Sequence, residues 1–487
     1  PVQLNSNDLY FTVQKKTDEE VVFRMSPGGD SYMDITYSLA ETNYQVDYSV
    51  TFHNMEKYLK AAEIAQYNWN MKSRSLEKSM AEEQKNSGVF YQYKGESRDY
   101  LSEAEDDELD LEARLDWLAF KQAYFSMVLI NSEGALLKGG EVSHRLIEED
   151  GYVKGYYAEL DQLNIESTDN GEFAFSLYLG PNRYKELAAY DNGMLRIINY
   201  GPSLFGWINR NFFQPIFSWM ADFGLNFGIV ILLLTIFVRV LITPLVFRNY
   251  KSSAKMRVMK PEVDEINKKY PDRADAMKKQ QEVMALYRST GVNPMAGCVP
   301  MLIQMPILFA MFRFIPSSFE IRQASFLWAD DLSSYDSILN LGFEIPFYGD
   351  HVSLFTLLMA ASTLAYTLMN SNQMSNPAGV QGMKLMMYLF PIMMIFFFNG
   401  YASGLSYYYL LSNLMSMGIM TIIKTRFIDE ENIRATLQEN KKKPKKKSKF
   451  AARLEQMQKA QQQKMQDQQN NRQSRRQGGG GKGKKKR

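Results

Sequence analysis

Apolar residues are concentrated between positions 204 and 424 of the chain, and their longest run lies near the start of that region. The run from Leu225 to Tyr250, LNFGIVILLLTIFVRVLITPLVFRNY, predicts a transmembrane helix, because about 20 mainly apolar residues cross the hydrocarbon core of a bilayer. Four further apolar stretches follow, at approximately Gly297–Ile315, Val352–Asn370, Lys384–Phe398 and Tyr401–Ile423. The pattern therefore predicts an α-helical membrane bundle of five spans.

Residues 1–196 have a different pattern, in which short β-branched and aromatic runs are separated by turn residues. The predicted strands are Leu9–Val13, Val21–Met25, Tyr32–Leu39, Tyr44–Phe52, Val89–Tyr93, Ala123–Ile130, Val153–Ala158 and Phe173–Leu179. Many short strands with such punctuation favour an antiparallel β-sandwich. We expect a helical insertion at about Asn54–Lys85 and a solvated acidic segment at Glu103–Glu112 to interrupt it.

Between these two regions, residues 203–220 form an amphipathic pattern. The apolar positions with helical spacing are Leu204, Trp207, Ile208, Phe212, Ile216 and Trp219, and the polar residues Asn209, Arg210 and Gln214 fall elsewhere on the helical wheel. This pattern predicts a helix that lies in the membrane interface and leads into the first span. A core helix of the soluble domain is the alternative.

Charge patterning predicts the orientation. The loop 248–288 holds 11 Lys or Arg and six Asp or Glu, whereas the loop 316–350 holds six acids and only Arg322 as a base. Because cytoplasmic loops are enriched in Lys and Arg, the first loop is predicted inside and the second outside. The β domain is then outside and the C-terminus inside. The chain begins at Pro1 without Met, and we expect a signal anchor, a sixth N-terminal span, to precede it.

The basic loop has a helical pattern of its own over residues 251–290. One apolar stripe consists of Met256, Met259, Val263 and Ile266, and a second of Met277, Val283, Met284 and Tyr287. We predict a cytoplasmic hairpin of two antiparallel helices joined at Pro271. Simple packing of these stripes against the membrane domain is the alternative.

A basic tail, residues 427–487, ends the chain. Its last part, from residue 441 on, holds 18 Lys or Arg against Glu455 and Asp467 and includes a Gln-rich stretch. Such a composition predicts disorder from about Asn440. Its charge suits ribosomal RNA phosphates or anionic lipid headgroups, although solubilisation and control of topology are also open.

Arg239 is the candidate functional residue of the first span. A charge at bilayer depth costs roughly 2.5–3.5 kcal/mol on insertion scales. Arg239 lies about two helical turns inside the apolar run, which leaves two interpretations. The side chain snorkels to the headgroups, or it provides a cation in a wet cavity between helices.

Other classes of site have little support in the sequence. Cys298 is the only cysteine, so no intrachain disulfide can form, and His53, His144 and His351 are far apart and suggest no metal site. The glycine run near the C-terminus lacks the phosphate-binding GxxxxGK[ST] pattern. The paired acids Asp330 and Asp331 have the character of a loop or helix-cap pair. We expect no cofactor, no metal and no enzymatic activity.

Three ordered segments resemble the YidC-type membrane protein insertases, the Oxa–YidC–Alb family. They are FVRVLITPLVFRNYKSSAKMRVMKPEVDEINKKYPD, then ALYRSTGVNPMAGCVPMLIQMPILFAMF, and finally SGLSYYYLLSN. The match covers about residues 207–424. Residues 1–195, ending in YLGPNRYKELAAY, resemble the periplasmic domain of Gram-negative members, a β-sandwich of sugar-mutarotase-like shape. The expected helical insertion Asn54–Lys85 and the long basic tail resemble the Bacteroidetes branch most. Ala402 and Met259 depart from the family pattern and affect only the expected local geometry.

The resemblance implies a function and a site. Family members insert membrane proteins through a hydrophilic groove that is open to the cytoplasm and to lipid, and the arginine matching Arg239 gives that groove its positive charge. Thr235, Gln304 and Tyr409 match positions that face the substrate. For Gln304 a hydrogen bond to a neighbouring helix is the structural alternative, and for Tyr409 it is core or interfacial packing.

The resemblance also implies the partners of such a protein. We predict a membrane protein insertase and chaperone of the bacterial inner membrane that acts alone or beside the Sec translocon. Nascent membrane proteins, membrane lipids and the ribosome, reached by the hairpin and the basic tail, are the expected partners, with no small-molecule substrate. The predicted domains are residues 1–196, 197–426 and 427–487. A polytopic transporter or enzyme with a carbohydrate-binding periplasmic domain is the alternative.

Overall fold

A computed structural model gives the architecture of residues 5–39, 44–55, 57–58, 66–131, 139–161, 172–271, 275–292, 299–371 and 381–442. The chain divides into two compact units. The first contains the N-terminal sheets and the apolar helices. The second contains the basic loop together with the start of the C-terminal segment. Each unit is described separately below.

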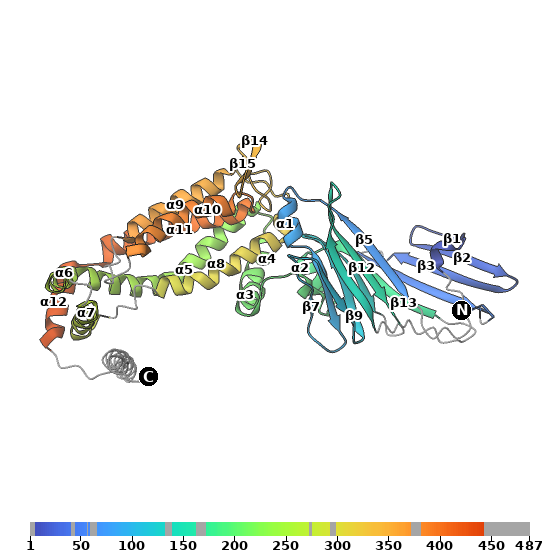
Figure 1. The fold of residues 1–487 in the computed structure, drawn as a ribbon, viewed down its shortest axis with the longest axis horizontal. Coiled ribbons are helices and arrows are strands. Elements are labelled where there is room, and N and C mark those ends of the chain that lie inside the picture. Colours follow the sequence, from blue (N-terminus) through green and yellow to red (C-terminus); the bar gives the residue numbers. More distant parts are fainter. Residues whose placement is uncertain are drawn as a thin grey trace, which may run out of the picture. The chain divides into compact units, whose positions relative to one another are not determined.

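Two antiparallel sheets form the N-terminal part of the first unit (Figure 1). The larger sheet has the strand order β1-β2-β3-β4-β13-β10-β9-β6-β7 and the smaller one the order β5-β12-β11-β8. The strands are β1 (Thr12–Lys16), β2 (Glu20–Gly28), β3 (Ser31–Leu39), β4 (Gln45–His53), β5 (Tyr67–Arg74), β6 (Gly88–Tyr93), β7 (Asp99–Tyr100), β8 (Asp107–Asp110), β9 (Leu115–Lys121), β10 (Phe125–Asn131), β11 (Gly140–Leu146), β12 (Tyr152–Leu160) and β13 (Glu172–Pro181). The predicted β-sandwich is confirmed, and each predicted strand overlaps an observed one.

Aromatic residues join the two sheets. Trp69 of β5 stacks on Phe120 of β9 with ring centroids 4.0 Å apart, and Tyr156 of β12 lies 5.1 Å from the same ring. Trp117 and Phe120 are both fully buried, on opposite faces of β9. The stacked pairs between the sheets combine a large apolar area with specific ring geometry, so they fix how the two sheets face each other.

The predicted helical insertion at Asn54–Lys85 is wrong. Residues Tyr67–Arg74 form β5, and only α1 (Met80–Lys85) is helical within the described part of this range. In the sequence YNWNMKSR, aromatic or other half-buried residues alternate with exposed polar ones, and this period of two is that of a strand. The predicted solvated acidic segment is also wrong in part, because Glu103 is buried and pairs with Lys121 at 3.1 Å.

Helices form the rest of the first unit. They include α2 (Tyr184–Ala188), α3 (Ser203–Ile208), a five-residue π-helical turn (Asn209–Phe213), α4 (Gln214–Ala221), α5 (Phe227–Val258), α8 (Val299–Ser317), α9 (Leu354–Ser371), α10 (Gln381–Phe398) and α11 (Ser403–Phe427). Helices α9, α10 and α11 pack side by side, and α8 contacts α3 and α11 (Figure 1). The last five of these helices coincide with the five predicted spans.

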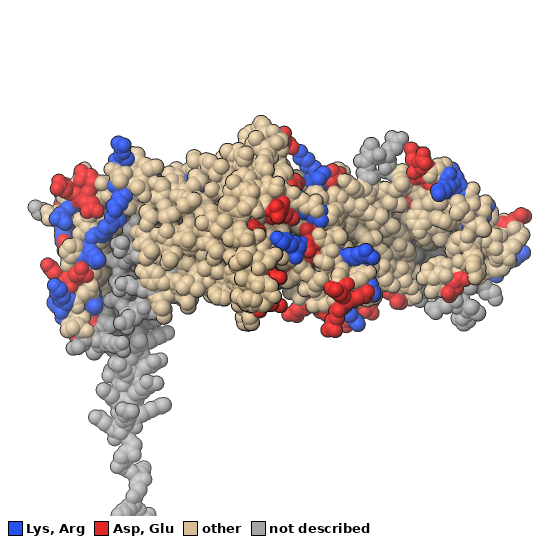
Figure 2. All heavy atoms as spheres, turned by 90° about the horizontal axis from the view of Figure 1, so that it is seen from above, with Lys and Arg blue, Asp and Glu red and all other residues tan. Residues whose placement is uncertain are grey.

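Among the described helices, only α5 is both long and apolar enough to cross a membrane, judged by length and composition alone. Shorter apolar helices occupy Leu354–Asn370 and Tyr388–Phe398. Seen from above, the surface of the helical part has a broad band that is almost free of charged side chains (Figure 2). Five spans therefore stay a prediction.

The segment 203–220 is helical as predicted, and its two faces differ. Leu204, Trp207 and Trp219 are exposed, whereas Phe213 and Phe217 are fully buried. The polar residues Asn209 and Gln214 are also fully buried, contrary to a simple apolar-in, polar-out pattern. The Asn209 amide donates to the backbone oxygens of Tyr200 and Ala310, at 2.9 and 2.8 Å. Asn209 thus connects α8 to the chain that enters the helical part.

A loop between α8 and α9 contacts the sandwich. Arg322 pairs with Glu77 at 2.8 Å, and both side chains are largely buried. The loop includes a hairpin formed by β14 (Leu339–Ile345) and β15 (Gly349–Val352). Asp331 accepts hydrogen bonds from the backbone of Gln323 and Ser333, which gives this acid a role in loop structure.

The second unit contains α6 (Lys260–Lys269), α7 (Ala276–Thr290) and α12 (Glu430–Lys442), together with the end of α5. Its apolar cluster contains Met256, Met259, Val263 and Tyr287 from the predicted stripes, and also Ile433 and Leu437 of α12. Met277, by contrast, is exposed. Two helices, α6 and α7, therefore occupy the range of the predicted hairpin, and its cytoplasmic position stays a prediction.

A third element completes this unit. The basic tail begins with α12, whose residues Ile433 and Leu437, four positions apart on one face, pack on the hairpin. Residues 443–487, which contain most of the predicted disordered stretch, lie outside the described residues.

Candidate substrate-binding site around Arg239

Arg239 lies in the middle of α5 and is nearly buried, with 9% of its surface exposed. Thr243, one turn later, donates its hydroxyl to the Arg239 carbonyl at 2.7 Å. Pro244 follows inside the helix and cannot donate a backbone hydrogen bond. The neighbouring Val240 and Leu241 are exposed, so the arginine lies on the protein-facing side of an otherwise apolar helix.

The guanidinium points toward α8. Its Nη1 donates to the Oε1 atom of Gln304 at 3.2 Å. Gln304 is partly buried and lies near the start of the described side chains of α8. Two of the four predicted site residues are therefore brought together, although 65 positions separate them in the sequence.

No carboxylate lies within 4.0 Å of the Arg239 guanidinium among the residues that the structure describes. Tyr408 of α11 and Tyr366 of α9 are the tyrosines near it. A buried arginine with neutral partners keeps its full charge and several donors available. This environment favours the second interpretation of Arg239, a cation held between helices, over a side chain that snorkels outward.

Thr235 lies one turn before Arg239 on the same helix. It is fully buried, and its hydroxyl donates to the Ile231 carbonyl at 2.7 Å. The hydroxyl is thus occupied by its own helix in this conformation. It lies on the face that carries the arginine, because residues four apart on a helix share a face.

Tyr409 is buried in α11 and faces α8. Its hydroxyl lies 3.4 Å from the Leu308 carbonyl, a long hydrogen bond, one turn beyond Gln304. Its ring contacts Phe398 of α10, with centroids 6.0 Å apart. Its contacts are thus those of a packing residue between three helices.

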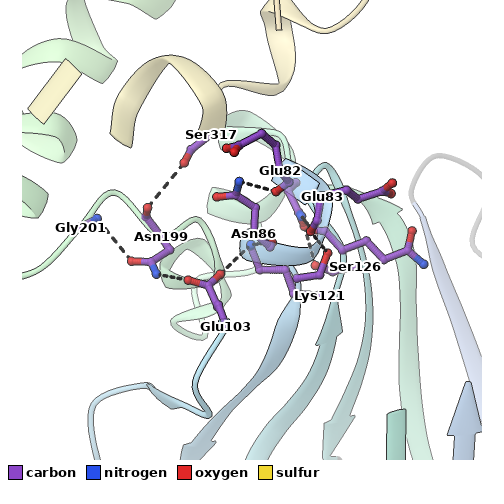
Figure 3. Close-up of polar contacts among 12 residues, drawn as sticks. Glu82, Glu83, Asn86, Glu103, Lys121, Ser126, Asn199, Gly201 and Ser317 are labelled. Atoms are coloured by element: carbon purple, nitrogen blue, oxygen red, sulfur yellow. Dashed lines mark hydrogen bonds and ion pairs between the residues drawn. The ribbon is translucent and has the colours of Figure 1, made fainter. Parts of the chain in front are cut away.

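The sequence analysis missed a second buried polar cluster, which joins the sandwich to the helices (Figure 3). Glu103 pairs with Lys121 of β9 and accepts a hydrogen bond of 2.7 Å from the Asn199 amide. The Asn199 carbonyl in turn lies 3.5 Å from the hydroxyl of Ser317, at the end of α8. Lys154 of β12 donates to the backbone oxygens of Ser87 and Glu103.

Burial and mutual attraction set the charges of this cluster. Burial lowers the pKa of Lys154 to about 8, and the Glu103 carboxylate opposes that shift. Burial would raise the pKa of Glu103, but attraction to Lys121 and the Asn199 hydrogen bond outweigh it, so the pKa is lowered. The cluster fits a structural link between the two parts. Sequence spacing gave no signal for it, since its members come from separate strands and loops.

Two family profiles together match nearly the whole chain. One, described as the YidC periplasmic domain, matches residues 2–215, and the other, described as 60Kd inner membrane protein, matches residues 219–431. The boundary between them falls inside α4. The sandwich and the helical region are therefore a periplasmic domain and an inner-membrane domain.

Several similar proteins share one name, and this chain matches most of the length of each. A protein of Bacteroides fragilis named membrane protein insertase YidC is 43% identical over 447 residues, which cover 90% of this chain and 72% of that protein. Proteins with the same name from Phocaeicola vulgatus and Porphyromonas gingivalis are 41% and 38% identical, covering 86% and 90% of this chain and 69% and 72% of theirs. The expected family, its Bacteroidetes branch and the insertase rather than enzyme class are confirmed. The chain belongs to the YidC family of membrane protein insertases.

Proposed function

We propose that this insertase moves polar segments of nascent membrane proteins through a hydrophilic groove whose positive charge is Arg239. One observation carries the proposal. The guanidinium is nearly buried between α5 and α8, with Gln304 as its hydrogen-bond partner and no carboxylate nearby among the described residues. A buried cation without a counterion is costly, so its presence supports a role in binding anionic groups.

The energetics of insertion fit such a groove. Moving a polar segment through intact lipid requires the removal of water from its charges and backbone groups. A wet groove that reaches part of the way shortens this passage, and a fixed cation offsets some of the cost for acidic segments. Burial of the apolar span of the substrate, at about 25 cal/mol per Å² removed from water, then drives the step.

The other site residues have distinct proposed roles. Gln304 orients the guanidinium and presents an amide to the substrate. Thr235 and Tyr409 line the groove on either side of the arginine. If their hydroxyls leave their present carbonyl partners, they can bind the backbone of a passing substrate segment. The hydroxyl of Tyr409 has the weaker bond of the two, at 3.4 Å compared with 2.7 Å for Thr235.

Orientation and partners form a second part of the proposal. The excess of basic residues in the loop 248–288 supports a cytoplasmic hairpin and tail, opposite the periplasmic sandwich. The ribosome is then reached by the hairpin and the basic tail, whose charge suits RNA phosphates. Membrane lipids surround the five proposed spans, and the Sec translocon is a second, optional partner.

Site-specific crosslinking tests the groove. A photo-reactive residue is placed at Gln304, Tyr409 or Thr235, and a ribosome-bound nascent chain with a single apolar span is supplied. We expect crosslinks from at least Gln304, and none from a matched probe at Leu241, which is exposed on the other side of α5. Equal crosslinking at Leu241 and at the groove positions, or none at the latter, would overturn the proposal.

A further inference from the structure

The β14–β15 hairpin exposes an unusual set of apolar side chains. Phe347 is 94% exposed, Phe343 62% and Leu339 57%. These residues lie within a single hairpin, beside the outer ends of α9 and α10, from which it projects (Figure 1). Isolated exposed apolar residues are common, but a contiguous set indicates an interaction surface.

The backbone at the tip supports the same conclusion. Phe347 has φ +66°, a left-handed conformation that L-residues with bulky side chains rarely adopt. A turn hydrogen bond from Tyr348 N to Ile345 O, at 3.0 Å, closes the tip. Glycine or asparagine would occupy such a position with less strain. A phenylalanine here presents its ring outward at a conformational cost, which fits a ring that is buried when the protein is in its working environment.

The β15 side of the hairpin is fixed to the helices from His351 up to Tyr348, the residue after Phe347. The amide of Asn399, just after α10, donates to the carbonyls of Tyr348 and His351, at 2.9 and 2.8 Å. The His351 Nε2 atom lies 2.9 Å from the Asn399 carbonyl, and the ring of Tyr335 stacks on His351 at 3.7 Å. The exposed tip is therefore held in a defined place rather than on a free loop.

The apolar surface of the hairpin continues onto α10. The Tyr348 ring lies 5.8 Å from that of Phe396. Among the side chains of α10 that the structure describes, the exposed apolar ones are Leu385, Tyr388, Leu389, Phe390, Ile392, Met393, Phe396 and Phe397. In a protein of the inner membrane, such a helix face contacts lipid. Figure 2 shows this side of the helical part without charged side chains over a wide area.

The charge of the hairpin determines what kind of contact with lipid it can make. Residues 338–352 contain Glu344 and Asp350 but no Lys or Arg, so the hairpin has no attraction for anionic headgroups. Its contact with a bilayer would be apolar and aromatic. Aromatic residues are favoured at the boundary between headgroups and acyl chains, where such segments are buried about 5–10 Å deep.

We propose that the β14–β15 hairpin is a membrane anchor, which inserts Phe343, Phe347 and Leu339 into the interfacial layer of the bilayer beside α10. It fixes the outer end of the helical bundle relative to the lipid surface. The proposal does not depend on the Arg239 groove. A protein partner that covers the same residues is the competing explanation, and the experiment below separates the two.

The test uses the full chain, purified and reconstituted alone in lipid nanodiscs. In a Cys298→Ala background, a fluorescent probe is attached at Asn340→Cys, a polar, exposed position of the hairpin. Lipids with a nitroxide near the carbonyl end of the acyl chain quench probes at interfacial depth. We expect quenching at Asn340 to be at least ~3-fold stronger than at Gln14→Cys, an exposed position of β1 at the far end of the sandwich (Figure 1).

A second variant tests the named side chains. Phe343→Ser with Phe347→Gly should reduce quenching at Asn340 to the level of the Gln14 probe, whereas a probe at Leu389→Cys on α10 should be unchanged, which shows that the helices remain in place. Replacement of neutral by anionic lipid should not strengthen the effect. A probe at Asn340 that is open to aqueous iodide, or shielded from both iodide and lipid by protein, would overturn the proposal.

Discussion

The Arg239 guanidinium donates a hydrogen bond of 3.2 Å to the Gln304 side-chain oxygen, so that a cation from α5 and an amide from α8 meet inside the helical bundle. An amide can orient a cation without neutralising it. The cation therefore stays available to an acidic segment of a substrate.

Reversal of the charge at Arg239 should affect some substrates more than others. In Arg239→Glu, a carboxylate repels acidic segments, and a pair of unit charges about 4 Å apart interacts by about 4 kcal/mol near a protein surface. We expect insertion of substrates with acidic outer segments to fall several-fold, with neutral segments less affected. Arg239→Lys is the matched control that retains the charge. Insertion is measured by protease protection of reconstituted substrates, and equal insertion by Arg239→Glu and the parent would contradict the electrostatic role.

Two variants of Gln304 separate orientation from charge. Gln304→Glu places a carboxylate beside Arg239 and forms a neutral ion pair, so it should impair insertion of acidic segments nearly as much as loss of the cation. Gln304→Leu removes the hydrogen bond but leaves the charge, and its effect should be smaller. The same protease-protection assay shows which of the two variants has the larger insertion defect. A larger defect in Gln304→Leu would mean that the amide itself, and not the free charge, is what matters.

Asn209→Ala should destabilise the helical part. The change removes two buried hydrogen bonds, to the carbonyls of Tyr200 and Ala310, and each such bond contributes about 0.5–1.5 kcal/mol. A lower melting temperature in detergent is the expected result. Asn211→Ala is the control, because the Asn211 amide donates to the Trp207 carbonyl at an exposed position. Equal melting temperatures for the two variants would show that the Asn209 bonds contribute little.

The stability of the sandwich should depend on Lys154 in alkaline solution. The pKa of Lys154 is lowered by burial to about 8 in the folded chain, from an ordinary value of 10.5. Between these values the unfolded chain binds more protons, so the free energy of unfolding rises with pH, whereas below pH 8 the cost of burying the charge is fully present.

Lys154→Met isolates this contribution. The melting temperature of the parent should rise relative to that of the variant as the pH increases from 7.5 toward 10, because only the parent loses a buried charge. Other titrating groups are common to both proteins and cancel in the difference. Thermal unfolding followed by tryptophan fluorescence gives both curves, since Trp69 is buried between the two sheets and Trp117 is buried on the other face of the larger sheet. A constant difference across this range would contradict the lowered pKa.

The second unit should come apart when α12 loses its apolar contact. Leu437→Asp puts a charge into the cluster formed with Met259 and Tyr287, at a cost of several kcal/mol. We expect faster proteolysis of α6 and α7, and weaker co-sedimentation with ribosomes if the hairpin takes part in that contact. Gln438→Asp, at the neighbouring exposed position, adds the same charge without entering the cluster. Unchanged proteolysis in Leu437→Asp would show that α12 does not stabilise the hairpin.

Periodic patterns predicted most of the secondary structure. Apolar runs gave the positions of α5, α8, α9, α10 and α11, and alternation gave eight strands of the sandwich. Tyr67–Arg74 also alternates with a period of two, but its many polar residues masked this pattern, and the prediction of a helix there was wrong. No sequence pattern indicated α12, since Ile433 and Leu437 are too few to indicate a helix until the hairpin that they cover is known.

The sequence by itself determined the family, the two-part architecture and the choice of Arg239, because hydropathy, periodicity and ordered motifs are local properties of the chain. Only the tertiary structure decided which partners meet. It brings Arg239 into contact with Gln304 and buries Glu103 against Lys121, although these partners are far apart in sequence. It also leaves Phe347 exposed. Burial and pairing of charges depend on packing between elements, and no local pattern encodes them.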